Sequence, residues 1–128
     1  MYVNTYIITI DAANKDRYLA LAKVFADVAK DFGALEIFEN WEEEIPDGNM
    51  TDYRKAVLAM PNEKIVLSWV IWPDRAAADY AHQNMFNDAR LSCMDEVLFD
   101  GKRMILGGFK PMLAWRKTSF DGPDESIQ

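Results

Sequence analysis

The fold is predicted by one stretch of the chain, Ile65-Val66-Leu67-Ser68-Trp69-Val70-Ile71-Trp72. Successive side chains of a strand point to opposite faces, so the four odd-numbered residues share one face and the four even-numbered residues share the other. Both faces are apolar apart from one hydroxyl, and such a strand must be covered on both sides. We therefore predict that this stretch is the centre of a sheet and that the rest of the chain supplies two covers.

Composition and charge exclude several classes of protein. The chain has 128 residues, half of them hydrophobic, with a net charge of -7. It lacks an apolar run of about 18 residues and a signal-peptide pattern, so we expect no membrane partner. The single cysteine, Cys93, cannot form an internal disulfide, which favours a cytoplasmic location. The negative charge, without a cluster of Lys and Arg, argues against nucleic-acid binding.

Periodicity divides the chain into alternating strands and helices. We predict strands at residues 2–10, 35–41, 65–72 and 102–109, a first helix from an Asn14 cap to Gly33, and a second helix after an Asp74 cap. Residues 55–60 are ambiguous, because they fit a helical turn or a short strand. The turn-like sequence at residues 60–63 favours a strand that forms a hairpin with the central strand. Residues 1–115 are expected to form one domain, and residues 116–128 a flexible tail.

The order of these elements predicts a ferredoxin-like α+β sheet. Right-handed crossovers place both helices on one face of such a sheet. The other face stays bare, although it carries large apolar side chains such as Trp69 or Trp72, and monomers rarely expose so much apolar area. We expect a homodimer joined through the open sheet faces, so that two sheets close into a dimeric α+β barrel.

Several segments resemble an uncharacterised bacterial family that includes the YbaA proteins. The segments that carry the resemblance are Gly33-Ala34-Leu35, Ile45-Pro46-Asp47-Gly48, Thr51-Asp52-Tyr53, Ala56-Val57, residues 66–73 and residues 99–109. The resemblance implies the dimeric α+β barrel superfamily, with a cleft between the sheet and the helices or loops of each protomer. It brings no activity with it, since that superfamily includes cofactor-free monooxygenases, lactone isomerases, haem-dependent dismutases and proteins without known chemistry.

Two charged segments are candidate sites. In the first, Asp100 stands beside Lys102 and Arg103, a pattern that would depress the pKa of the carboxyl and offer an anion site. In the second, Asp52, Tyr53 and Arg54 would bind a small anion or position an oxygen substrate. Exposed turns and helix caps explain the same residues and are favoured over a site in both segments.

Aromatic residues suggest a pocket for a flat molecule. Trp41, Trp69 and Trp72 would line it, although aromatic residues in strands covered on both sides more often belong to the core. The only histidine, His82, is predicted to lie on the surface; it excludes a multi-histidine metal site and leaves open a single axial haem ligand. We expect no metal and no cofactor.

Three functions are compatible with these patterns. The favoured one is a small-molecule-binding module. The alternative is a cofactor-independent enzyme, of the monooxygenase or isomerase type, that acts on a small aromatic or anionic metabolite. In that case Asp100 or Asp52 would be the base and Arg54 and Arg103 would hold an oxyanion. The third is protein interaction through the acidic loop at residues 42–50.

Overall fold

The computed structural model describes residues 1–92, 94 and 97–117. In chain order the elements are β1 (Tyr2–Asp11), η1 (Ala12–Asn14), α1 (Lys15–Asp31), β2 (Glu36–Trp41), α2 (Tyr53–Ala56), β3 (Glu63–Trp72), α3 (Arg75–Asn84), η2 (Met85–Asn87), α4 (Ala89–Ser92) and β4 (Ile105–Phe109). None of the helices in these residues is both long enough and apolar enough to cross a bilayer.

The predicted central strand is confirmed as β3. The sheet is antiparallel with the order β2-β3-β1-β4. β3 pairs with β1 along its whole length, from Tyr2 opposite Trp72 to Asp11 opposite Glu63. β2 takes the other edge of β3, and β4 lies on the outer edge of β1.

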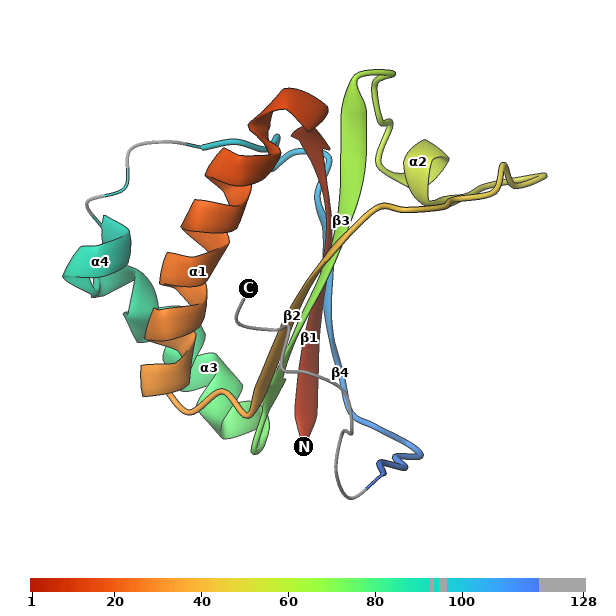
Figure 1. The fold of residues 1–128 in the computed structure, drawn as a ribbon. Helices are drawn as coiled ribbons and strands as arrows, with labels where there is room; N and C mark the ends of the chain where they lie inside the picture. The colour runs from red at the N-terminus through yellow and green to blue at the C-terminus, as the bar shows by residue number, and fades with distance from the viewer. Residues whose placement is uncertain (93, 95–96, 118–128) are drawn as a thin grey trace.

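Helices α1, α3 and α4 cover one face of the sheet, which we call the helix face (Figure 1). α1 buries Tyr18, Ala22, Val28 and Ala29 on this face. The predicted cap of α3 is also confirmed, because the Asp74 carboxylate accepts a hydrogen bond from the Ala77 amide at 2.8 Å. The arrangement is the predicted ferredoxin-like α+β fold.

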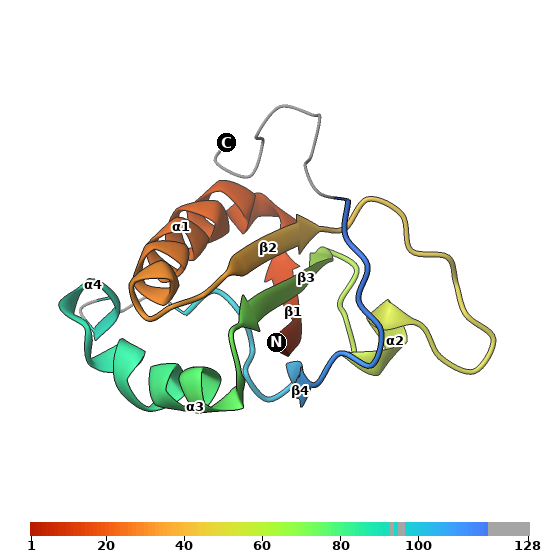
Figure 2. The same cartoon turned by 90° about the horizontal axis from the view of Figure 1, so that it is seen from below.

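The register assigns each strand residue to a face. On β3, Val66, Ser68, Val70 and Trp72 are buried under the helices. Leu67, Trp69 and Ile71 point to the opposite side, the open face, and are partly buried. The acidic loop that follows β2, together with α2, projects on this open side, whereas the helices stay on the other (Figure 2).

The predicted strand at residues 55–60 is wrong. This region contains α2, a single helical turn, followed by a turn into β3. The Asp52 carboxylate starts the helix by accepting a hydrogen bond from the Lys55 amide at 2.7 Å. Leu58 then takes a left-handed conformation with φ 54°, which no strand allows.

Two predicted boundaries also change. β4 begins at Ile105 instead of residue 102, because residues 101–103 form a turn. Asn14 makes no side-chain cap; Asp11 accepts from the Ala13 amide instead and caps the short η1 turn that runs into α1. Cys93 and residues 118–128 of the predicted tail lie outside the described residues.

Candidate ligand site between the sheet and the helices

The helix face carries a row of polar side chains in mainly apolar surroundings. Sheet register places Glu39 of β2 beside Ser68 of β3, and Ser68 beside Tyr6 of β1. The next residues of β3 on this face, Val66 and Val70, are buried and apolar. A charged residue in such a row needs partners, since an isolated buried charge is very costly.

Glu39 is held by two hydroxyl groups. Tyr18 on α1 donates to Oε1 at 2.6 Å, and Ser68 donates to Oε2 at 2.9 Å. Burial raises the pKa of Glu39 above its ordinary value, and the two hydrogen bonds offset only part of this rise. Burial and the nearby Glu39 also raise the pKa of Tyr18 and of Tyr6. Glu39 is therefore a carboxyl group that keeps its proton to a higher pH than an exposed glutamate does.

A second group lies in the next two rows along the helix face. Asn4 of β1 and Trp72 of β3 are buried there. Among the residues that the structure describes, neither the Asn4 amide oxygen nor the Trp72 indole nitrogen has a hydrogen-bond partner. Leaving such a group unpaired costs about 1–3 kcal/mol, so two together call for a physical reason.

His82 on α3 joins the two groups. Its ring meets Trp72 edge-on, with the centroids 6.3 Å apart, and its Nε2 lies 3.4 Å from the Tyr6 hydroxyl. Unlike its neighbours on the sheet, His82 is exposed, as predicted. It therefore connects the buried polar side chains to the surface.

The rim around His82 is apolar. Phe86 follows one helical turn later and is exposed, and Leu106 of β4, which pairs with Tyr6, is 61% exposed on the helix face. Gly108 of β4 lies beside Asn4, and a Cβ atom there would run into the Tyr2 hydroxyl. The exposed edge between α3 and β4 thus offers an imidazole flanked by apolar surface, with unpaired polar atoms behind it.

A concave feature lies on the open side, at the end of β2. This acidic depression has a volume of about 180 Å³. It is lined by Asn40, Trp41, Glu42, Glu43, Glu44, Ile45, Tyr53, Ile65 and Leu67. Two of the predicted ligand-binding residues, Trp41 and Tyr53, are therefore brought together here. Three neighbouring carboxylates make it unsuitable for an anion.

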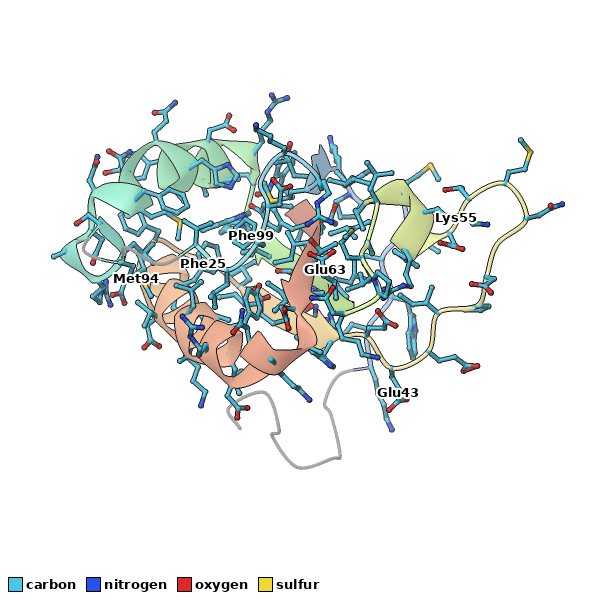
Figure 3. All side chains as sticks on the ribbon, turned by 90° about the horizontal axis from the view of Figure 1, so that it is seen from above. Phe25, Glu43, Lys55, Glu63, Met94 and Phe99 are labelled. Atoms are coloured by element: carbon cyan, nitrogen blue, oxygen red, sulfur yellow. The ribbon has the colours of Figure 1, made fainter. Side chains whose placement is uncertain are left out.

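Arg103 is engaged in a set of hydrogen bonds that we call the Arg103 clamp. Its two terminal nitrogens donate to both carboxylate oxygens of Glu63 at 2.8 Å, one of them also to the Leu58 carbonyl, and its Nε donates to Asp100. The Arg103 guanidinium holds the pKa of Glu63 at about 2. The clamp ties the segment before β4 to the turn before β3. Figure 3 labels Glu63 beside the strands and Glu43 on the loop that follows β2.

Arg54 also holds the turn before β3 in place by hydrogen bonds. It donates to the Glu42 carboxylate at 2.9 Å and to the Glu63 and Met60 carbonyls at 2.8 Å. The two arginines predicted to hold an oxyanion therefore converge on Glu63 and the turn around it. Their donors bind groups of the chain itself.

The two predicted bases are placed in turns. Asp52 accepts from the Gly48 and Lys55 amides, and these hydrogen bonds lower its pKa. Asp100 accepts from the Lys102 amide and from Arg103, and its pKa is lowered for the same reason. Both carboxyl groups are thus ionised and weakly basic.

The remaining predicted residues lie apart from one another. Trp69 stacks on Phe38 with the centroids 5.0 Å apart and donates its indole N–H to Glu36, on the open face. Lys102 is exposed in the turn before β4. Within the described ranges, no group of three or more His, Cys, Asp or Glu side chains is placed to hold a metal ion.

The polar row was not among the candidates chosen from sequence. The available signal was Glu39, a charged residue on the otherwise apolar face of the strand at residues 35–41. By spacing, its partner Tyr18 belongs to an apolar face of the first helix, and Asn4 is one polar residue within the first strand. Nothing in their spacing shows that three strands and a helix place them together.

Comparison with known proteins agrees with the predicted resemblance. Residues 1–101 match the family model described as a protein of unknown function, DUF1428. The uncharacterised protein YbaA of Escherichia coli strain K12 is 42% identical over 113 residues, which is 88% of this chain and 97% of that protein. YbaA of Shigella flexneri gives the same values.

A solved structure shares the fold. A crystal structure of a variant of MhuD, with two manganese protoporphyrin IX molecules bound per active site, aligns with a TM-score of 0.61. The alignment covers 91% of this chain and all of that one, at 12% sequence identity. At this identity the similarity concerns the fold alone.

Replacing Glu39 by Gln is expected to stabilise the protein relative to the wild type as the pH rises from about 4 to about 8. The folded pKa of Glu39 lies above its unfolded value, so the wild type loses stability as pH rises through the folded pKa, whereas Gln does not titrate. Chemical denaturation at several pH values measures the difference. Glu36→Gln, which changes the same strand on its open face, is the control; a difference that does not vary with pH would contradict the assignment.

Replacing Glu63 by Gln is expected to have the opposite dependence. With a folded pKa of about 2 against an ordinary value of 4.5, the clamp stabilises fully above pH 4.5 and loses its effect as pH falls towards 2. The variant should therefore be less stable than the wild type near neutral pH, and the gap should close in acid. The same denaturation series tests this, with Asp27→Asn on the surface of α1 as the control.

Proposed function

This chain belongs to the DUF1428 family of proteins of unknown function, and we propose that it is a homodimeric small-molecule-binding module. The ligand binds on the helix face, at the edge between α3 and β4. Asn4, Trp72 and His82 are the residues that contact it. Tyr53 of the acidic depression lies on the open side and, in this proposal, takes part in contacts between copies. Trp41 pairs with Val66, and its side chain packs on the helix face against the core around Tyr18.

One observation carries this assignment. On the helix face, two buried polar atoms, the Asn4 amide oxygen and the Trp72 indole nitrogen, lack a partner in the described part of the chain. Trp72 meets the His82 ring, and Asn4 lies two residues along β1 from Tyr6, whose hydroxyl is 3.4 Å from His82. Unpaired donors and acceptors inside a protein are typical of places where another molecule completes the hydrogen bonds. Small-molecule sites combine mainly apolar walls with a few such polar groups.

The surroundings favour a flat, mainly apolar ligand with a polar or metal-bearing centre. The rim of Leu106 and Phe86 offers apolar contact, and His82 offers a nitrogen ligand whose contact with Tyr6, at 3.4 Å, is long enough to be given up. A metalloporphyrin meets this description, since its metal accepts an axial histidine and would supply redox or oxygen chemistry when bound. The porphyrin-containing MhuD structure, which has the same fold, supports the choice.

The homodimer is proposed from the open face. Trp69, Leu67 and Ile71 lie partly buried there, and Phe109 and Ile105 of β4 are exposed. A second copy would cover these side chains, at about 25 cal/mol per Å² of apolar area removed from water. The helix faces, with the proposed ligand sites, would then point outward from the dimer.

Titration of the protein with manganese or iron protoporphyrin IX tests the ligand proposal. We expect a saturable shift of the porphyrin absorption band, and His82→Ala should change the spectrum and weaken binding by about tenfold, or 1.4 kcal/mol. Gln83→Ala, the exposed neighbour of His82 on α3, is the matched control and should bind as the wild type does. Absence of saturable binding, or equal binding and spectra for His82→Ala, would reject the porphyrin assignment.

Glu39 favours a second candidate function, a cofactor-independent enzyme acting on a small aromatic or anionic metabolite. A buried carboxyl with a raised pKa, held by Tyr18 and Ser68, has the properties of a general acid or base. Tyr6 lies between it and His82, so a ligand at the proposed site would come near this row. Asp52 and Asp100 are weaker candidates because their pKa values are lowered.

For this second candidate, Glu39→Gln is expected to reduce turnover by about 10²–10⁴-fold while leaving substrate binding in place. Oxygen uptake and product formation, measured over a panel of small aromatic and anionic metabolites, report the turnover. Glu36→Gln serves again as the matched control on the opposite face. Equal turnover by the Glu39 variant and the wild type would rule out this role.

A further inference from the structure

After β4 the chain continues across the open side of the sheet. Residues 110–117, which we call the arm, leave the β4 edge and pass to the level of β2, on the side opposite α1 and α3 (Figure 2). Arg116 closes this path by donating to the Glu36 carboxylate at the start of β2, at 2.7 Å. The arm is therefore fixed at both ends, by β4 and by Arg116.

The apolar side chains of the arm contact almost nothing in their own chain. Met112 is 99% exposed, Leu113 89% and Trp115 84%. Exposed apolar side chains are ordinary when scattered, but three within four residues form a continuous patch. A tryptophan alone buries roughly 150–250 Å² when it finds a partner. The arm thus carries an apolar surface that no described part of its own chain covers.

The acidic depression is a complementary surface at the other end of the same side. Ile45, Ile65 and Leu67 give it apolar lining, and the half-exposed Tyr53 borders it. Glu43 and Glu44 add exposed carboxylates to its rim. The arm brings Lys110 beside its apolar residues, so the two surfaces match in both apolar character and charge.

The arm cannot reach this depression in its own chain. Arg116 holds the arm at Glu36, where β2 begins, whereas the depression lies at Asn40 and Trp41, where β2 ends. At about 3.3 Å per residue, the length of β2 separates them. A two-fold axis that runs across the strands between two facing sheets exchanges the two ends, and so brings the arm of one copy to the depression of the other.

We propose that the arm of each copy binds in the acidic depression of a second copy, so that the same contact forms twice in the dimer. This rests on the homodimer proposed above and adds to it. Trp115 would enter the apolar part of the depression, with Met112 and Leu113 against its rim, and Lys110 would face Glu43 and Glu44, while Arg116 stays paired with Glu36 of its own chain. A stable interface buries about 800 Å² per partner, and the arm supplies part of that area together with the open face.

Sedimentation velocity of the full chain at a series of concentrations tests this proposal. The wild type should be a dimer at micromolar concentration, and Trp115→Ala should raise its dissociation constant by about tenfold or more, as expected for a tryptophan anchor. Leu19→Ala, an exposed apolar residue on α1, is the control and should leave the dimer unchanged. A wild type that is monomeric overturns both the dimer and the arm; a dimer that is insensitive to Trp115→Ala overturns the arm alone.

A disulfide trap tests the contact directly. In a Cys93→Ser background, a chain carrying Trp115→Cys is mixed and oxidised with a chain carrying Tyr53→Cys. A cross-linked pair is expected in this mixture, and not when the second chain carries Leu19→Cys instead. Absence of the cross-link in a sample that remains dimeric overturns the proposal. So does a cross-link within one chain when both substitutions are combined, because the arm would then occupy its own depression.

Discussion

The pairing of β3 with β1 is the constraint on which the rest of the molecule depends. Ten consecutive residue pairs fix which side chains meet on each face. A shift of this register by one residue would turn Ser68 and Trp72 to the open side and Trp69 under the helices. The polar row, the position of β2 and the position of β4 all follow from this one register.

The sheet separates two sets of properties. Its helix face buries Glu39 with Tyr18 and Ser68, and places Trp72 against His82, with Asn4 in the adjoining row. Its open side carries the Arg103 clamp, the acidic depression and the arm. A ligand bound under α3 would therefore leave the contacts between copies free, and a dimer formed through the open side would leave the ligand site accessible.

The general fold could be predicted from sequence because its signals are local. The two apolar faces of residues 65–72 indicate a covered central strand, and Asp74 begins its helix through the amide three residues later. Residues 55–60 were predicted incorrectly because the apolar pattern fits both a strand and a helical turn. The Asp52 cap and the left-handed Leu58, which decide between them, are visible only in the structure.

The site could be predicted less well, because its contacts join distant segments. From sequence, Arg54 and Arg103 appear as cations available to a ligand, while their partners at Glu63 and the turn around it lie elsewhere in the chain. Glu39 and Tyr18 are 21 residues apart and meet only because α1 folds back over β2.

The Arg103 clamp also bears on how the chain folds. It joins Arg103 to Leu58 and Glu63 across 45 and 40 residues. Such distant contacts form only after the intervening loop has closed, which delays them relative to helices and tight turns. We therefore expect the turn before β3 and the segment leading into β4 to become ordered together and late in folding, so that the last strand joins the sheet as the clamp closes.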